Sequence, residues 1–362
     1  MKNTFGNSVA VTLFGESHGE YIGAVIDGLA PGIEVNDDYI KNMLTLRRPQ
    51  GKTATARVEA DNFKIVSGVI NNKTTGTPIT ILIPNENVRS ADYSEMSSIL
   101  RPSHADYTAE CKYKGFEDSR GGGHFSGRIT AALVAAGAIC KCALEQKGIY
   151  IGTHVGACAE VKDIEFSNYL EDIKALNQKT FAVLSDEKAE EMKTAILKAA
   201  EEGDSVGGIL ETAVVGMPTG VGEPWFDTIE GMISHAVFSI PAIKGIEFGL
   251  GFAFADKKGS EANDSFKIEG DKIVTATNNN GGINGGITNG MPIIFRTVVK
   301  PTPTIFKEQN TVNIKTMTET VLTAKGRHDP AIVHRARVVQ DAVTALVLAD
   351  ALALRFGTDW IK

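Results

Sequence analysis

Residues 120–146 read RGGGHFSGRITAALVAAGAICKCALEQ, a glycine-rich loop that runs directly into a long apolar segment. The segment predicts a helix over residues 127–146 that is stopped by Gly148, with apolar side chains on nearly all of its faces. A helix that is apolar all round is buried in the interior of a protein. The sequence therefore predicts a helix at the centre of the molecule.

A second helix of the same kind is expected over residues 331–356, where Gly357 stops it. The longest apolar runs of the two helices, 131–140 and 343–354, are too short to span a bilayer, and the second contains Asp350. Two such helices favour a layered fold with helices at the centre and sheets outside. They disfavour a parallel sheet wrapped by amphipathic helices.

Strands and helices are expected to alternate along the rest of the chain. Segments rich in Val, Ile and Thr predict strands over residues 8–14, 21–26, 63–70, 79–83, 209–215 and 293–299. Further helices are expected over residues 36–48, with Asn36 as N-cap, and 185–202, ended by Gly203, and residues 256–270 are expected to form a polar loop. Neither a repeat nor a Pro- or Ser-rich linker is visible, so residues 1–362 are expected to form one large domain.

Composition indicates a soluble globular protein. Hydrophobic residues make up 43% and charged residues 22% of the 362 residues, which excludes disorder. With 37 Lys plus Arg against 44 Asp plus Glu, the net charge of −7 argues against a nucleic-acid partner. The first residues precede a short apolar strand rather than a signal sequence, so we expect a cytoplasmic protein that does not enter a membrane.

The cysteines indicate neither a disulfide framework nor a metal site. There are four, too few and too irregularly spaced to staple a chain of this length. Cys140 and Cys142 form a C-x-C pair inside the apolar helix, but no partner ligands follow at comparable spacing. We therefore expect no metal.

Glycine is unusually frequent and unevenly placed. Fifteen of the 37 glycines lie in the four short segments 15–23, 121–127, 203–208 and 281–290. Any one of these segments could be a simple turn, because glycine adopts positive φ without strain. Since three of the four lie beside His or Arg, together they favour loops that approach a ligand closely.

The first glycine segment contains Gly15-Glu16-Ser17-His18-Gly19, which matches the G-x-S-x-G motif of serine hydrolases. In that motif the serine is the nucleophile and a helix begins directly after it. Here a second strand is expected at residues 21–26, and only one strand precedes the motif. A hydrolase that uses Ser17 is thus a minor alternative.

The second glycine segment predicts an anion site. It lies between Arg120 and Arg128 at the expected start of the central helix, where backbone N–H groups and guanidinium groups attract anions. It has neither the Gly-Lys-Ser/Thr ending of a P-loop nor the glycine spacing of a dinucleotide fingerprint. A phosphate-bearing ligand other than a P-loop nucleotide is therefore expected.

Arginine and histidine recur beside proline in three further segments, RRP at 47–49, RPSHAD at 101–106 and RHDP at 327–330. Guanidinium groups that converge suit carboxylate and phosphate oxygens. His18 and His104 are the best general acid–base candidates because the ordinary pKa of histidine lies near neutrality. The residues indicate an enzyme with a small polyanionic substrate, and a flavin- or anion-binding protein without catalysis stays open as the alternative.

Seven motifs in order along nearly the whole chain resemble the chorismate synthases. They are GESHG at 15–19, RPSHAD at 101–106, RGGGHFSGRITA at 120–131, GDSVG at 203–207, GGINGG at 281–286, KPT at 300–302 and GRHDP at 326–330. The resemblance implies an α+β sandwich of central buried helices between two antiparallel sheets, assembled as a homotetramer. It also implies a lyase that converts 5-enolpyruvylshikimate 3-phosphate to chorismate and phosphate by 1,4-anti elimination with reduced FMN.

The same resemblance implies a role for each matching residue. His18 would protonate the reduced flavin, His104 would act near the leaving phosphate and the flavin ring, and Ser17, Ser126 and Asp329 would relay protons. The substrate would be held by Arg47, Lys52, Arg101, Arg128, Arg327 and Arg335. FMN would contact His124, Phe125, Ser126, Pro241, Ala242, Gly285, Lys300, Pro301, Thr302, Pro303, Thr304 and Arg327.

The resemblance leaves open how the flavin is reduced. NADPH is a candidate reductant, and the missing dinucleotide fingerprint favours an external flavin reductase as a partner. The chain also departs from a common family pattern. His124, Phe125 and Ile129 stand where Arg, Ser and Glu are frequent, Ser103 replaces a frequent Gly, and Ala331 replaces a frequent Cys.

Overall fold

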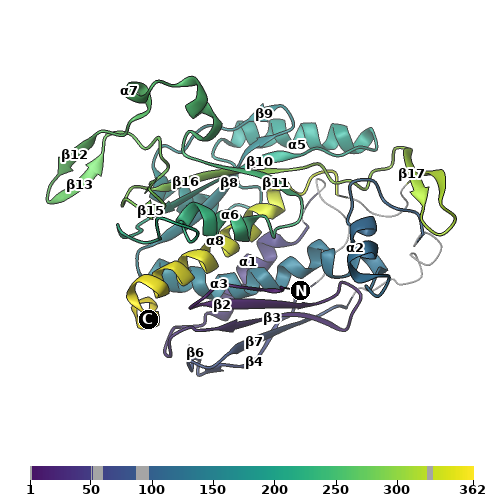
Figure 1. Cartoon of the computed structure of the whole chain (residues 1–362), viewed down its shortest axis with the longest axis horizontal. Helices are drawn as coiled ribbons and strands as arrows, with labels where there is room; N and C mark the ends of the chain where they lie inside the picture. The colour runs from purple at the N-terminus through teal and green to yellow at the C-terminus, as the bar shows by residue number, and fades with distance from the viewer. Residues whose placement is uncertain (1, 50, 52–59, 87–97, 324–328) are drawn as a thin grey trace.

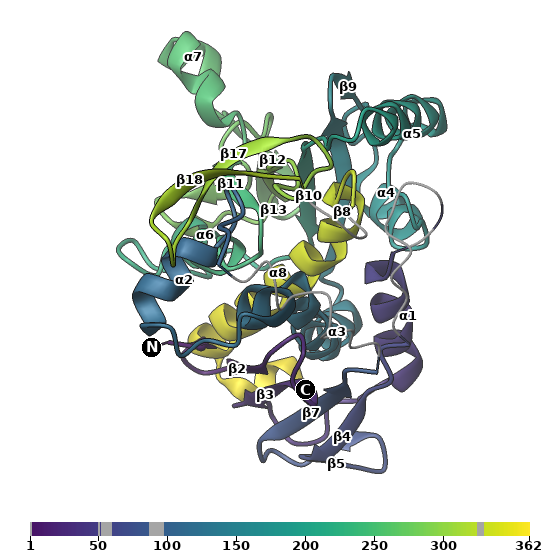
Figure 2. The same ribbon diagram turned by 90° about the vertical axis from the view of Figure 1, so that its right-hand side faces the viewer.

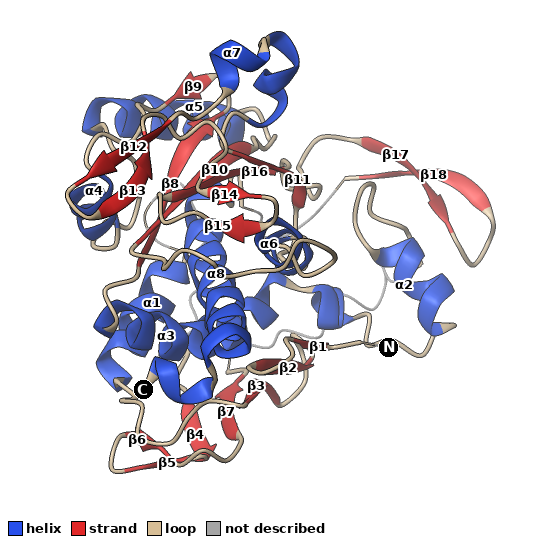
Figure 3. Ribbon diagram, turned by 60° about the vertical axis from the view of Figure 1, so that its left-hand side comes forward, coloured by secondary structure: helices blue, strands red, loops and turns tan. Residues whose placement is uncertain are grey.

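The computed structural model describes residues 2–49, 51, 60–86, 98–323 and 329–362. Two five-stranded antiparallel sheets form the outer layers, and three helices lie between them (Figure 1 and Figure 3). These helices are α1 (Asp37–Arg47), α3 (Thr130–Gln146) and α8 (Val333–Phe356). The expected α+β sandwich with central buried helices is therefore confirmed.

The lower sheet in Figure 1 has the strand order β1-β2-β3-β7-β4. Its strands are β1 (Thr4–Phe5), β2 (Ala10–Gly15), β3 (Tyr21–Asp27), β7 (Ile79–Pro84) and β4 (Lys64–Ser67). The predicted strand at 63–70 is wrong in its second half. It breaks at Gly68, which has a φ of 81° and packs against the backbone of Ile79, and β5 (Val69–Ile70) pairs with β6 (Lys73–Thr74) instead.

The upper sheet has the order β11-β16-β10-β8-β9. Its strands are β11 (Ile243–Phe248), β16 (Ile293–Val299), β10 (Gly208–Val215), β8 (Tyr150–Cys158) and β9 (Val161–Lys162). The strands predicted at 209–215 and 293–299 are confirmed. Sequence reasoning missed β8 and β11, in both of which glycine interrupts the run of strand-forming residues.

Shorter elements connect and cover the sheets. The remaining helices are α2 (Asp106–Tyr113), α4 (Tyr169–Leu176), α5 (Asp186–Glu201), α6 (Ile229–Val237) and α7 (Gly259–Ala262). The remaining hairpins are β12 (Phe266–Glu269) with β13 (Lys272–Thr275), β14 (Ile283–Asn284) with β15 (Ile287–Thr288), and β17 (Gln309–Asn313) with β18 (Thr318–Leu322). The predicted loop at 256–270 is thus wrong in part, because it contains α7 and β12.

The caps of two helices follow the sequence. The Asn36 side chain accepts a hydrogen bond from the Tyr39 N–H at 3.0 Å at the start of α1, and Ser185 accepts one from Lys188 at the start of α5. The central helix, by contrast, starts later than predicted. Residues 127–129 form a 3₁₀ turn, and α3 begins at Thr130.

The two long helices touch through small residues. A Cβ atom added at Gly137 of α3 would lie 2.5 Å from both the Cβ and the carbonyl oxygen of Ala342 in α8. The backbones of the helices therefore meet at this point. The segment Gly127–Gln146 is long and apolar enough to cross a membrane, but 94% of it is buried inside the protein, as expected for a core helix.

Helix α8 also carries buried polar groups that bind it to both sheets. Asp350 accepts hydrogen bonds from the backbone N–H groups of Asn7, Ser8 and Val9, at 2.7–3.1 Å, just before β2. At its other end, Asp341 accepts from Lys141 at 2.9 Å and from Thr153 of β8 at 2.6 Å. These carboxylates fix the position of α8 between the layers.

Replacing Gly137 by Ala tests the contact between α3 and α8. Alanine favours helix by about 1 kcal/mol over glycine, but its methyl group would overlap the backbone of Ala342, which cannot rotate away. We expect a net destabilisation of about 1–3 kcal/mol in urea unfolding followed by circular dichroism. Gly259→Ala in α7 is the control, because its added Cβ has open space around it. Equal midpoints for wild type and Gly137→Ala would contradict the packing.

Candidate active site

The turn between β2 and β3 packs against the glycine loop at 120–127. The Ser17 N–H donates to the Gly123 carbonyl at 3.1 Å, and the Ser17 hydroxyl donates to the Arg120 carbonyl at 3.2 Å. Gly121, Gly122 and Gly123 all have positive φ, at 60°, 99° and 53°. A Cβ on Gly121 would lie 2.0 Å from Cε1 of His18, so only glycine lets the loop approach this histidine.

These contacts exclude the hydrolase alternative. After the turn the chain forms β3, antiparallel to β2, instead of a helix. Ser17 is fully buried, and its hydroxyl hydrogen is directed to the Arg120 carbonyl rather than to a base. The same bond determines the tautomer of His18, because Nδ1 must then donate to the Ser17 Oγ, 3.1 Å away.

His104 reaches the same loop from the segment before α2. Its Nδ1 lies 2.6 Å from Oδ1 of Asp106, and Arg101 binds the same carboxylate in a bidentate manner at 2.6 and 2.8 Å. Burial would raise the pKa of Asp106, but the hydrogen bonds from Arg101 and His104 outweigh it and hold the pKa far below its usual range. The ionised carboxylate therefore accepts the Nδ1 proton of His104 and leaves Nε2 next to Gly122.

Asp61 pairs with two of the expected substrate-binding arginines. Its carboxylate, which is fully buried, lies 2.8 Å from Nη2 of Arg47 and also forms an ion pair with Arg128. Burial would raise the pKa of Asp61, but the two guanidinium groups outweigh it and lower the pKa. Nε of Arg128 donates to Oδ1 of Asn85 at 2.9 Å, and the amide of Asn85 in turn donates to the turn at 15–19.

The start of α8 joins this group. Nη1 of Arg335 lies 2.7 Å from the Asp329 carboxylate, and Nε of Arg335 donates to the Arg47 carbonyl at 3.1 Å. The Thr302 hydroxyl donates to the Asp329 carbonyl at 2.7 Å. The segment at 300–304 therefore lies beside Asp329.

Lys300 connects this segment to the histidine side of the site. Its ammonium group donates to the Ser103 carbonyl at 2.6 Å, and its backbone N–H donates to the Ala242 carbonyl at 2.9 Å. Ser103 has a φ of 58°, a left-handed conformation that glycine adopts more easily than serine. We call the residues connected by these contacts the loop cluster: residues 15–19, 101–106, 120–128 and 300–304 with Arg47, Asp61, Asp329 and Arg335.

Three of the residues that depart from the family pattern lie in the loop cluster, namely Ser103, His124 and Phe125. Nδ1 of His124 lies 2.7 Å from the Gly15 carbonyl oxygen, so this side chain ties the glycine loop to the end of β2. Phe125 is 38% exposed and meets Tyr113 of α2 edge to face at 6.0 Å. Ser126 caps the following turn by accepting from the Arg128 N–H at 3.2 Å.

Some expected residues are not connected to the loop cluster. Gly285 lies in the turn between β14 and β15, beside α6, and within the described ranges no hydrogen bond joins it to the cluster. In the same segment Gly281 packs against the backbone of Gly249, so the glycines of this fourth segment serve tight turns of the backbone. Pro241 lies in the loop between α6 and β11, next to Ala242. Two further predicted residues, Lys52 and Arg327, lie outside the described residues.

The loop cluster carries an excess of positive charge. Its six described cations, Arg47, Arg101, Arg120, Arg128, Lys300 and Arg335, stand against the four carboxylates of Glu16, Asp61, Asp106 and Asp329, which leaves two positive charges. Arg47 is buried, which lowers its pKa, and Asp61 offsets this effect. The arrangement suits a polyanion despite the acidic balance of the whole chain.

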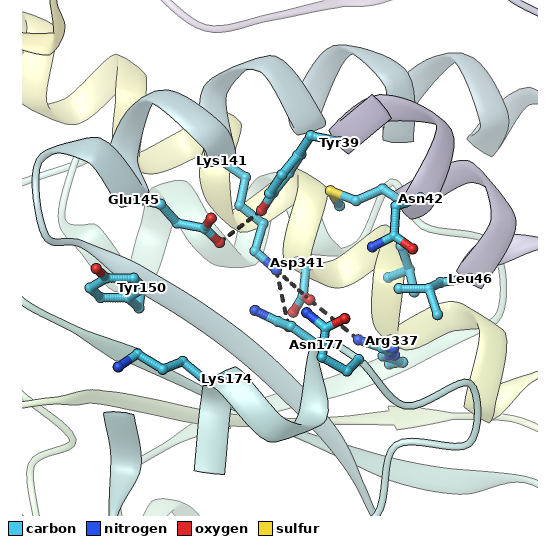
Figure 4. A pocket seen from close by; sticks show the side chains of 13 residues that line it. Tyr39, Asn42, Leu46, Lys141, Glu145, Tyr150, Lys174, Asn177, Arg337 and Asp341 are labelled. Carbon is cyan, nitrogen blue, oxygen red and sulfur yellow. Dashed lines mark hydrogen bonds and ion pairs between the residues drawn. The ribbon is translucent and has the colours of Figure 1, made fainter. Parts of the chain in front are cut away.

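A cavity of about 140 Å³ lies elsewhere, between α1, α3, α4, α8 and β8 (Figure 4). Among the residues predicted for the site, none of those that the structure describes lines it. A smaller cavity of about 40 Å³ touches the loop cluster at Thr304 and Asp329.

Sequence reasoning missed two residues of the loop cluster, Asp61 and Asp106. It also missed Asn85, which binds Arg128 and the turn at 15–19. Asp106 could have been found, because it follows His104 by two residues within a motif already singled out. Asp61 gives no signal in its own neighbourhood, since its partners are 14 and 67 residues away along the chain.

Comparison with known proteins agrees with this geometry. Residues 9–353 match the sequence profile of the family described as chorismate synthase. The chain belongs to the chorismate synthase family. Chorismate synthase from Dehalococcoides mccartyi is 46% identical over 360 residues, which cover 99% of this chain and 98% of that one. The enzyme from Pyrococcus abyssi is 46% identical over 350 residues, which cover 97% of each.

A solved structure, described as the crystal structure of chorismate synthase, superposes with a TM-score of 0.77 at 32% identity and covers 97% of this chain and 94% of that one. The likeness extends to the antiparallel sheets and the buried helices. As a member of this family the chain is a soluble lyase of the shikimate pathway that converts 5-enolpyruvylshikimate 3-phosphate to chorismate.

Replacing Asp61 by Asn tests whether one buried carboxylate holds two arginines. The change leaves Arg47 and Arg128 buried without their counter-charge, so we expect a loss of about 3–5 kcal/mol in unfolding free energy. Asp118→Asn is the matched control, because its partner Arg120 is 51% exposed and such surface pairs contribute less than about 1 kcal/mol. Equal losses in the two variants, measured by urea denaturation, would contradict the assignment.

Gly121→Ala tests the close approach of the glycine loop to His18. The new methyl group would force the imidazole to move, and alanine would be strained at a φ of 60°. We expect a folded protein whose His18 imidazole NMR signals shift and whose chorismate formation falls at least about tenfold. Gly127→Ala, with open space around its Cβ, should leave both unchanged. Unshifted His18 signals in Gly121→Ala would refute the contact.

Proposed function

We propose that the elimination takes place in the loop cluster, with reduced FMN bound there. The observation that carries this proposal is the placement of His18 and His104 against the adjacent glycines Gly121 and Gly122, beside an excess of two positive charges. Two potential proton donors and a set of guanidinium groups thus face one loop. This is the combination that expulsion of phosphate requires.

Loss of phosphate breaks a C–O bond and leaves negative charge on the departing oxygens. Guanidinium groups that are already oriented stabilise this charge without reorganising at the moment of reaction. In our proposal Arg47, Lys52, Arg101, Arg128, Arg327 and Arg335 hold the carboxylates and the phosphate of the substrate. Asp61 and Asp106 orient three of these side chains beforehand.

The histidines move protons in this proposal. His104, oriented by Asp106, presents Nε2 to the leaving phosphate and the flavin ring, and His18 protonates the reduced flavin. Ser17 links His18 to the loop, and Ser126 and Asp329 complete the proton relay. In each ring Nδ1 donates to a fixed acceptor, which leaves Nε2 to face the reacting molecules. A ring that gives a proton to the flavin or the phosphate does so as the imidazolium, in which Nε2 is protonated as well.

The residues of the loop cluster fit a flavin phosphate and ring. The glycines at 121–123, which have positive φ, expose backbone groups, and Phe125 offers an exposed aromatic face. Ala242 lies beside Lys300, the cation that begins the segment at 300–304. Reduced FMN, when bound, lends electron density as phosphate leaves and regains it as hydrogen is lost from the ring. We assign its contacts to His124–Ser126, Pro241, Ala242, Lys300–Thr304 and Arg327, and keep Gly285 as the least supported member.

Further proposals concern the state of the protein in the cell. We infer that it works in the cytoplasm, which the four free cysteines support, because exposed thiols such as Cys111 persist in a reducing compartment. The buried core runs from Val9 to Ile361, which supports one domain over residues 1–362. We also propose that the protein assembles as a homotetramer. Its flavin is reduced either by an external reductase or by NADPH.

An anaerobic assay with 5-enolpyruvylshikimate 3-phosphate and chemically reduced FMN tests the cofactor. We expect chorismate and phosphate in equal amounts, none with oxidised FMN, and none without flavin. Turnover without flavin would overturn the cofactor assignment. Binding of both ligands without turnover would favour the non-catalytic alternative.

Histidine variants test the placement of the chemistry. His18→Ala and His104→Ala should each lower turnover by about 100-fold or more, which is the usual contribution of a general acid or base. Both should keep the fold, as judged by circular dichroism. His235→Ala in α6 is the matched control and should retain turnover. Near-native rates in either site variant would remove that histidine from the mechanism.

A further inference from the structure

The cavity of about 140 Å³ shown in Figure 4 has a floor of buried charged side chains. Lys141 of α3 is 3% exposed, and Arg337 and Asp341 of α8 are each 1% exposed. The mouth is formed by residues nearer the surface, including Asn42 of α1 and Lys174 of α4. The site therefore opens to solvent at one end and is dry and charged at the other.

The cations of this cavity are not fully matched. On the floor, Lys141 and Arg337 contribute two positive charges against the one negative charge of Asp341, which leaves one. Lys174, at the mouth, is already paired with Glu171 at 3.0 Å. Asp341 is shared, because it accepts from Lys141 at 2.9 Å and from Thr153 at 2.6 Å and lies 3.8 Å from Arg337. Nε of Arg337 is buried and has no hydrogen-bond partner in the described part of the chain. A buried donor without a partner is costly, and a ligand oxygen would satisfy it.

Glu145 opposes this excess only weakly. The Tyr39 hydroxyl donates to its carboxylate at 2.7 Å, so one of its oxygens is already used. Burial raises the pKa of Glu145, although Lys141 and the Tyr39 hydrogen bond partly offset the shift. The side of the cavity toward Arg337 thus keeps a net positive charge.

The rest of the lining consists of apolar and aromatic side chains and of the three amides of Asn42, Asn177 and Gln178. Leu46 and Tyr150 lie on opposite sides of the cavity (Figure 4), and Tyr39, Met43 and Val338 also line it. A cavity of about 150 Å³ lined by apolar side chains holds a benzene molecule, so a ring-sized body fits the present volume. One excess positive charge suits one carboxylate, whereas a phosphate or a dicarboxylate would overcompensate it.

We propose that this cavity is a second ligand site, which binds a small monocarboxylate with a ring-sized apolar body. The carboxylate lies toward Arg337 and Lys141, and the ring lies between Leu46 and Tyr150. The site is separate from the loop cluster and shares no lining residue with it. The proposal therefore stands independently of the proposed catalytic site.

Benzoate is the probe, and benzamide, which has the same shape without the charge, is its control. Titration of the full-length protein, followed by ligand-observed NMR and calorimetry, should show saturable binding of one benzoate per chain. Benzamide should bind at least tenfold more weakly. Absence of saturable benzoate binding, or equal affinity for both compounds, would overturn the proposal.

Two variants place the probe in the protein. Asn42→Trp places a large side chain at the mouth of the cavity, and because Asn42 is exposed the change does not disturb core packing. It should weaken benzoate binding at least tenfold and leave thermal stability unchanged. Arg101→Ala, in the loop cluster, should leave benzoate affinity unchanged. The reverse pattern, with binding lost in Arg101→Ala and kept in Asn42→Trp, would assign benzoate to the catalytic site and refute a second one.

Discussion

The buried carboxylates of α8 are the constraint on which the architecture depends. A 24-residue helix with almost all of its residues buried must lie between two sheets without leaving polar groups unsatisfied. Asp350 meets this need through three backbone N–H groups of residues 7–9, and Asp341 does so through Lys141 and Thr153. The Thr153 hydroxyl is also hydrogen-bonded to the Thr212 hydroxyl at 2.7 Å, and Thr212 accepts a hydrogen bond from Gln340 of α8. These hydrogen bonds connect α8 to two strands of the upper sheet, and Figure 2 shows α8 running between the layers.

The position of the catalytic loops follows from this arrangement. Arg335 lies in the first turn of α8, and Arg128 lies in the 3₁₀ turn before α3, so fixing the two helices fixes both guanidinium groups. Asp61 adds the link to α1 through Arg47. The loops themselves are held by backbone contacts with glycine, which lets His18 and His104 approach one another from segments 86 residues apart in the sequence. A scaffold that is rigid through its core can therefore present a site made almost entirely of loops.

The sequence predicted the layers because two helices without a polar face can only be buried, and because the six segments it indicated as strands are rich in Val and Ile. It failed where a tertiary contact overrides a local pattern, as at Gly68, which ends a strand by packing on Ile79. The site was predicted where motifs keep arginine, histidine and glycine together. Asp61 could not be predicted, because only the fold brings it to Arg47 and Arg128. The second cavity was equally invisible, since its lining comes from five elements that are separate in the sequence.

The central claim is that the loop cluster, rather than the larger cavity between α1 and α8, holds the reacting molecules. A crystal structure with 5-enolpyruvylshikimate 3-phosphate and oxidised FMN bound together tests it most directly. The account predicts the substrate phosphate and carboxylates on Arg47, Arg101, Arg128 and Arg335, with the flavin ring within hydrogen-bond reach of His18 and His104. Electron density for either molecule in the cavity lined by Lys141, Arg337 and Asp341, with the loop cluster empty, would contradict it.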